Sequence, residues 1–172
     1  MTTRGFPWLL LALTIAGGLL PHPANVTPVG ALGLFAGAYA SARYAWLVPV
    51  AALLTANLVN GFYDLTVLVC VYLGMLAGPL FGHWLLRRRR HVSRISAAVI
   101  ASALTFYLIS NFGVWLAGMY PPDAAGLAQC YLNGLPYLVR SLLGDAAYTA
   151  LLFGGWELAN CFARQRSVQG VG

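Results

Sequence analysis

The sequence predicts an all-α fold, a polytopic membrane protein built as a bundle of six transmembrane helices in a single domain, 1–172. Two observations predict it. The chain is 60% hydrophobic and only 8% charged, whereas about a quarter of the residues of an ordinary soluble domain are charged. Its ten basic residues are all arginine, and all except Arg140 fall in alternate gaps between long apolar runs.

The arginine pattern predicts the orientation of the helices. The arginines of the alternate gaps are Arg4, Arg43, Arg87, Arg88, Arg89, Arg90, Arg94, Arg164 and Arg166. The gaps 21–25, 60–64 and 118–133 contain none. Membrane proteins retain arginine and lysine on the cytoplasmic side. We therefore expect a multi-pass protein of the bacterial cytoplasmic membrane with both termini in the cytoplasm.

Six apolar runs predict the six helices. They cover 6–20, 26–42, 44–60, 65–86, 95–117 and 134–161. A helix needs about 20 residues to cross the hydrocarbon core, and the fourth and fifth runs meet that length. The second and third runs are short and are joined by a tight turn. The sixth run is long enough to tilt or kink, and its glycines allow this.

The first run, 6–20, has a second interpretation. A charged start before a short apolar core is also typical of a secretory signal peptide. The residues that follow, 21–24, lack the small-x-small pattern of a cleavage site. We therefore expect this helix to be retained.

Polar residues inside the runs gather toward the predicted outer side. Asn57, Asn60 and Asp64 are three and four residues apart at the outer end of the third helix, so they share one helical face. Asn111 and Trp115 are four residues apart near the outer end of the fifth helix. The polar residues of two helices are therefore expected at one depth.

The sixth helix carries two ionisable residues in its first turns, Arg140 and Asp145, and Asn25 lies in the first outer loop. Ionisable groups inside a bilayer are costly and almost always find partners. Arg140 and Asp145 are five residues apart and point to different faces of the helix. We therefore predict an ion pair between Arg140 and Asp64, while Asp145 has Ser141 four residues before it.

The outer residues support two hypotheses, an outward cavity that binds a small polar or heteroaromatic molecule, or a closed structural network. The predicted substrate-binding residues are Asn25, Asn57, Asn60, Asn111, Trp115, Arg140 and Asp145. A cavity of about a few hundred cubic ångströms bordered by at least four of them would support binding. Side chains that point to different helix interfaces would favour the structural alternative.

Motifs for catalysis and nucleotide binding are missing from the sequence. It contains no H-E-x-x-H, G-x-S-x-G, P-loop or G-x-G-x-x-G pattern. Its three histidines and three cysteines show no metal or redox spacing. We expect no enzymatic activity, no cofactor, no metal and no nucleic-acid partner. We do expect membrane lipids as partners, since the run 87–90 attracts anionic headgroups.

Three stretches resemble an uncharacterised family of small bacterial six-helix membrane proteins. They are HPANVTPVGALGLFAGAY at 22–39, the SNFGVW core of 105–115, and LLGD at 142–145 followed by YTALLFGG at 148–155. More loosely, the chain is similar to the substrate-binding subunits of energy-coupling-factor transporters. That similarity implies a solute bound from outside and partners in the membrane, a coupling subunit with two ATPases. Ala12 and Ala16 match the alanine-x-x-x-alanine pattern through which such subunits associate.

The expected function is therefore a small-molecule-binding membrane subunit of a transporter. The alternative is a non-catalytic accessory subunit packed into a larger integral-membrane complex. The outward polar residues favour the first hypothesis, and the absence of a diagnostic ligand group keeps the second open.

The predicted topology can be tested by cysteine labelling of intact cells. An impermeant thiol reagent should label single cysteines introduced within 118–133 and should not label those introduced within 87–94. The reason is that the arginine-rich segment is retained in the cytoplasm. Labelling in the opposite sense would contradict the orientation.

Overall fold

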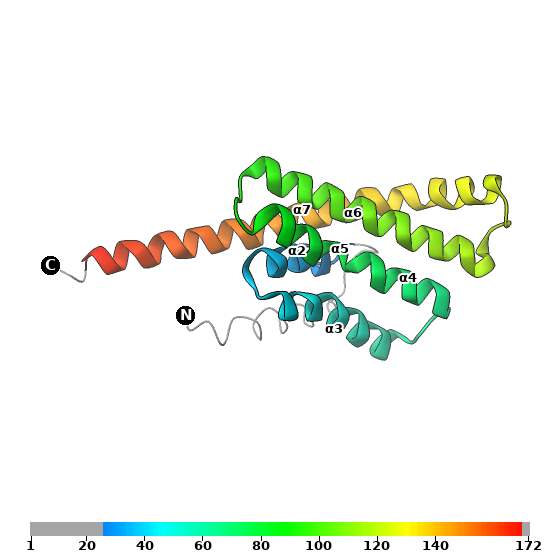
Figure 1. Cartoon of the computed structure of the whole chain (residues 1–172), viewed down its shortest axis with the longest axis horizontal. Coiled ribbons are helices and arrows are strands. Elements are labelled where there is room, and N and C mark those ends of the chain that lie inside the picture. The colour runs from blue at the N-terminus through cyan, green and yellow to red at the C-terminus, as the bar shows by residue number, and fades with distance from the viewer. Residues whose placement is uncertain (1–25, 170–172) are drawn as a thin grey trace.

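The computed structural model describes residues 26–169, and this part of the chain is helical, with short connections and no strand (Figure 1). The elements are α2 (Val29–Tyr39), α3 (Ala42–Asn60), α4 (Leu65–Met75), α5 (Ala77–Phe81), α6 (Val92–Val114), α7 (Ala124–Gln169) and two π-helical turns, η1 (Gly82–Leu86) and η2 (Trp115–Met119). The predicted first helix, 6–20, with Ala12 and Ala16, and the predicted site residue Asn25 lie outside the described residues.

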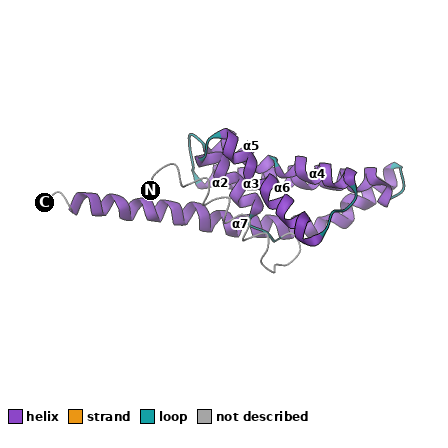
Figure 2. Cartoon of the chain, turned by 90° about the horizontal axis from the view of Figure 1, so that it is seen from below, coloured by secondary structure: helices purple, strands orange, loops and turns teal. Residues whose placement is uncertain are grey.

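The helices form an elongated bundle. α6 packs along both α4 and α7, and α2 packs against α3, α5, η1 and α7. The C-terminal part of α7 projects beyond the other described helices (Figures 1 and 2). α2 therefore contacts α3, α5, η1, α6 and α7.

α2 is short and almost completely buried. Of its eleven residues, all between Val29 and Ala38 except Gly30 are buried. Eleven residues rise about 16 Å, which is about half of a hydrocarbon core of roughly 30 Å. The predicted helix over 26–42 is therefore shorter than its apolar run, because it begins after Pro28 and ends before the extended residue Ala40.

Glycines bring α2 into direct backbone contact with the segment formed by α5 and η1. A Cβ atom at Gly37 would collide with the backbone carbonyl of Pro79, and one at Gly82 would collide with the carbonyl of Leu34. Small residues allow helix backbones to approach closely where apolar side chains cannot intervene. A glycine of α2 and a glycine of η1 therefore each allow the two backbones to touch.

Two continuous helical stretches are long and apolar enough to cross a membrane. They are Leu65–Leu86, formed by α4, α5 and η1, and Val92–Met119, formed by α6 and η2. Only 33% and 22% of their most apolar windows are buried. A helix that is apolar all round normally lies inside a large protein core or in a membrane. These two stretches agree with the predicted runs 65–86 and 95–117.

α7 is much longer than predicted. It begins at Ala124 instead of residue 134 and continues for 46 residues through Pro136. Asp123 precedes it, and its Oδ1 accepts a hydrogen bond of 2.7 Å from the Gly126 N–H. This cap explains why the helix starts early, since aspartate satisfies free N–H groups at helix starts. Cys130, expected in an outer loop, is instead buried within α7.

The predicted ion pair between Arg140 and Asp64 is wrong, since the two form none. Asp64 caps α4, where its Oδ1 accepts hydrogen bonds from the Thr66 N–H at 2.8 Å and the Val67 N–H at 3.1 Å. Arg140 is exposed on α7, and its guanidinium lies 5.8 Å from the ring centre of Tyr137. The carboxylate of Asp64 hydrogen-bonds to N–H groups two and three residues later in the chain, so it is satisfied without a partner from another helix.

The contact between η1 and α2 makes Gly82 a sensitive position. Gly82→Ala should lower the thermal unfolding temperature of the detergent-solubilised protein. The added methyl meets backbone atoms of Leu34, and overpacking of this kind typically costs about 1–3 kcal/mol.

Gly154→Ala is the matched control, because a Cβ at Gly154 meets no atom within 4 Å. It should leave the unfolding temperature unchanged or raise it, since alanine favours a helix over glycine by about 1 kcal/mol. Equal unfolding temperatures for the two variants would contradict the close contact.

Candidate functional site

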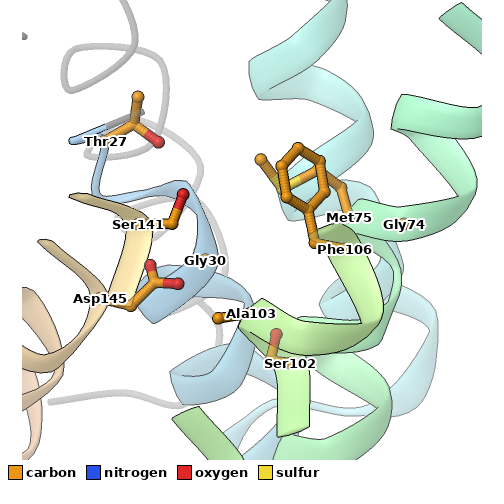
Figure 3. Close-up of a pocket in the computed structure, with 9 residues that line it drawn as sticks. All are labelled: Thr27, Gly30, Gly74, Met75, Ser102, Ala103, Phe106, Ser141 and Asp145. Carbon is orange, nitrogen blue, oxygen red and sulfur yellow. The ribbon is translucent and has the colours of Figure 1, made fainter. Parts of the chain in front are cut away.

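A cavity of about 210 Å³ with both polar and apolar walls lies between the start of α2 and residues of α4, α6 and α7 (Figure 3). Its walls come from segments far apart in the sequence. It is lined by Thr27, Gly30, Gly74, Met75, Ser102, Ala103, Phe106, Ser141 and Asp145. The cavity is therefore a product of the tertiary fold and not of one local motif.

Asp145 lies at the N-terminal end of α2. Its side chain is 9% exposed, and its carboxyl group faces the backbone of Gly30 and Ala31. The first N–H groups of any helix have no intrahelical partner, and Pro28, which precedes α2, supplies no side-chain cap. The carboxyl group from α7 thus takes the position of an N-terminal cap, where the helix dipole favours negative charge.

Gly30 makes room for this carboxyl group. A Cβ atom at position 30 would collide with Asp145 Oδ1 and would lie 2.7 Å from Oδ2. Any other side chain at Gly30 would therefore displace Asp145 from the start of α2.

Hydroxyl groups and an aromatic ring complete the lining. Ser102 of α6 is 5% exposed, and Ser141 lies one helical turn before Asp145. Within the described residues, neither serine hydroxyl has a hydrogen-bond partner, so both are available to a bound molecule. Phe106 and Met75 form an apolar wall across the cavity (Figure 3).

A second, smaller space continues along the contact between α6 and α7. Its volume is about 20 Å³, and it shares Phe106 and Ser141 with the main cavity. Asn111 and Tyr137 also line it. Asn111 thus lines a small space next to the cavity, not the cavity itself.

The asparagines of α3 lie away from the cavity. Asn57 is buried, and its Nδ2 donates to the Tyr72 hydroxyl of α4 at 3.3 Å. Asn60 is exposed and donates to the carbonyl of Ala56 in its own helix at 3.0 Å. Asn57 therefore joins two helices, and Asn60 stabilises the end of one.

The remaining predicted residues are also used locally. Asn111 Nδ2 donates to the Tyr107 carbonyl at 2.8 Å, and Trp115 Nε1 donates to the Pro121 carbonyl at 2.9 Å. Arg140 is exposed, as described above. The indole of Trp115 therefore fixes the connection before α7 and does not face the cavity.

The structure does not bring the predicted residues into one cavity. Asp145 borders the main cavity, Asn111 borders its small extension, and Asn57, Asn60, Trp115 and Arg140 lie elsewhere. Of the predicted residues that the structure describes, Asp145 alone lines this cavity. Their polar groups are satisfied locally by neighbouring helices and carbonyls, and so they do not converge.

Sequence reasoning missed Ser102, Ser141 and Phe106 as lining residues. The sequence places Ser141 four residues before Asp145, on the same face of α7, and it places Ser102 four residues before Phe106 on one face of α6. Small hydroxyl residues are common in membrane helices because they also support helix packing. Their type alone therefore did not distinguish a cavity wall from a packing contact.

The chemistry of the cavity suits reversible binding. A carboxyl group, two or three hydroxyls and a phenyl ring can hold a molecule by hydrogen bonds and by contact with its flat face. Among the described residues, no cluster of three or more His, Cys, Asp or Glu side chains could hold a metal ion.

A family model described as "Family of unknown function (DUF6580)" matches residues 2–168. The chain belongs to this family. The match covers nearly the whole sequence and confirms the inference of an uncharacterised family, and it carries no activity over to this member. No curated protein and no solved structure matches the chain.

The contact between Gly30 and Asp145 generates a coupling prediction. Gly30→Ala should lower the thermal unfolding temperature, because the new methyl collides with the carboxyl group. In an Asp145→Ala background the same substitution should cost clearly less, since the obstacle is gone. Strict additivity in this double-mutant cycle would mean that the two side chains do not meet.

Proposed function

We propose that this chain is a small-molecule-binding protein of the bacterial cytoplasmic membrane that serves as the solute-binding subunit of a transporter. The cavity beside Asp145 would be its binding site. The observation that carries the proposal is a nearly buried carboxyl group that lines a cavity at the start of a short buried helix.

The depth of the cavity supports this proposal. From Val92 at the start of α6 to Ser102 the helix rises about 15 Å, which is about half the thickness of a hydrocarbon core of roughly 30 Å. If α6 crosses the membrane from end to end, the cavity lies near the midplane. Secondary transporters bind their solutes at that depth, often at the N-termini of helices that stop halfway. α2 has the length of such a half-helix, and its start lines the cavity.

The outer surface of the bundle supports a membrane location. Large apolar side chains are exposed along the two long helical stretches, among them Leu73 at 54%, Leu108 at 52% and Leu116 at 56%. Contiguous exposed apolar surface of this kind is unfavourable in water. In a bilayer it would face lipid.

The lining defines the class of solute. Asp145 and the serines suit a molecule with several hydrogen-bond donors, and Phe106 suits a flat or heteroaromatic part. The cavity of about 210 Å³ is smaller than the roughly 300–1,000 Å³ of sites for drug-sized ligands. We therefore propose a small polar or heteroaromatic solute.

Transport would require energy from other chains. The sequence has no P-loop, and the similarity to substrate-binding subunits of energy-coupling-factor transporters implies a separate coupling subunit with ATPases. In this proposal the chain supplies recognition, and its partners supply the motor.

An accessory subunit without a solute is the second candidate. It is favoured by the dispersal of the predicted residues, since Asn57, Asn111 and Trp115 hold the protein's own helices and connections together. The two candidates differ in whether the cavity beside Asp145 is occupied in the functioning protein.

Native mass spectrometry of gently solubilised protein tests the proposal. The wild type should retain a small-molecule adduct, and Asp145→Asn and Phe106→Ala should each lose most of it, because the hydrogen-bonding carboxylate or the ring is removed. Arg140→Gln is the control, since this residue is charged but exposed away from the cavity.

A wild type without an adduct, together with stoichiometric co-purification of membrane subunits, would support the accessory role. Equal loss of the adduct in all three variants would contradict the assignment of the site.

A further inference from the structure

An apolar groove, separate from the two spaces described above, lies between the first half of α6 and the middle of α7. Its volume is about 720 Å³. Its lining includes Val92, Val99 and Ile100 from α6, and Leu142, Ala146 and Phe153 from α7. We call this space the α6–α7 groove.

Small residues on one face of α7 create the groove. Ala146, Ala150 and Gly154 follow one another at four-residue spacing, so they lie on the same side of the helix. All three line the groove, opposite the branched side chains of α6. Larger residues on this face would close the space.

One end of the groove is positively charged. Arg90 lines it there, and its Nη2 donates to the carbonyls of Ala38 and Arg87, each at 3.3 Å. The guanidinium lies 4.1 Å from the ring centre of Tyr39. The arginine is thus held in place at the mouth of the groove.

No carboxylate among the described residues forms an ion pair with Arg90. Glu157 lines the same end and accepts a hydrogen bond of 3.1 Å from the Tyr39 hydroxyl. Four further arginines, Arg87, Arg88, Arg89 and Arg94, lie in the adjoining sequence and are exposed. Arg90 is thus the positive charge that lines this end, and the exposed arginines near it in the sequence make the surrounding surface attractive to anions.

The length of the groove fits one leaflet of a bilayer. From Val92 to Ile100 the α6 wall rises about 12 Å, close to the roughly 15 Å that corresponds to half a hydrocarbon core. The charged end lies beside the arginine-rich connection between η1 and α6, which the positive-inside pattern assigns to the cytoplasmic surface. The apolar part of the groove then extends toward the midplane.

We propose that the α6–α7 groove binds one anionic phospholipid of the cytoplasmic leaflet. An acyl chain would lie along the small face of α7, and the headgroup phosphate would meet the guanidinium of Arg90, which can donate to it bidentately. This inference rests on the membrane location in the proposed function and is independent of solute binding at Asp145.

The test is titration of delipidated protein with phosphatidylglycerol or phosphatidylcholine, with bound lipid counted by native mass spectrometry. The wild type should bind one phosphatidylglycerol more tightly than phosphatidylcholine. Arg90→Gln should weaken phosphatidylglycerol binding about fivefold, the factor expected for one basic residue at a membrane surface. Arg88→Gln, the same change of charge outside the groove, should have little effect.

A second pair of variants tests the apolar part without touching the arginines. Ala150→Phe fills the groove and should reduce binding of both lipids. Leu151→Phe, at a neighbouring exposed position outside the lining, should not. Thermal unfolding of each variant identifies any loss that comes from misfolding.

Equal weakening by Arg88→Gln and Arg90→Gln would overturn the proposal in favour of diffuse attraction to the surface. Full lipid binding by Ala150→Phe would overturn it as well, as would a stable dimer that binds no lipid. Asp145→Asn should lose the small-molecule adduct and keep the phospholipid, so failure of the solute site and failure of the lipid site are distinguishable.

Discussion

The fold depends on satisfying both ends of one short buried helix. α2 is almost completely buried, so the free N–H and C=O groups at its two ends need partners from the protein. At its start the carboxyl group of Asp145 faces the backbone of Gly30 and Ala31, and at its end Arg90 donates to the carbonyl of Ala38. One side chain comes from α7 and the other from the segment before α6. The charges have the signs that the helix dipole favours at each end.

These two contacts organise the rest of the bundle. Because α2 is tied to α7 at one end and to the α6 connection at the other, the two long helices must pack beside it. Glycines hold its face against α5 and η1, and Phe35 packs edge-to-face on Phe153 of α7 with ring centres 5.1 Å apart. The cavity beside Asp145 then lies at the start of α2, and the α6–α7 groove reaches its end through Arg90. The same helix thus positions these two spaces.

The apolar runs predicted the stretches Leu65–Leu86 and Val92–Met119 well, since length and hydropathy are local properties of the sequence. The length of α2 and the early start of α7 were not predicted. They depend on single residues, Pro28 before α2 and the cap Asp123 before α7, which the average hydropathy of a long run does not reveal. The candidate site was harder to predict. Asp145 was recognised because a carboxyl group in an apolar run is costly, but the same reasoning selected Arg140, which lies on the surface. Ser102 and Phe106 carried no comparable signal, because only the packing of α6 against α2 and α7 turns them into a cavity wall.

The way in which α2 is capped favours a binding role over a purely structural one. A serine, threonine or asparagine in place of Pro28 would satisfy the first N–H groups of the helix locally. Such a cap would avoid taking a carboxyl group out of water, which is among the costliest ways to satisfy a donor. The protein instead has proline at that position, brings Asp145 from a helix more than a hundred residues away in the sequence, and leaves a cavity beside it. A closed structural network would fill that space with the protein's own groups, as happens around Asn57 and Asn111. A buried carboxyl group beside unpartnered serine hydroxyls is the arrangement expected where a ligand supplies the missing hydrogen bonds.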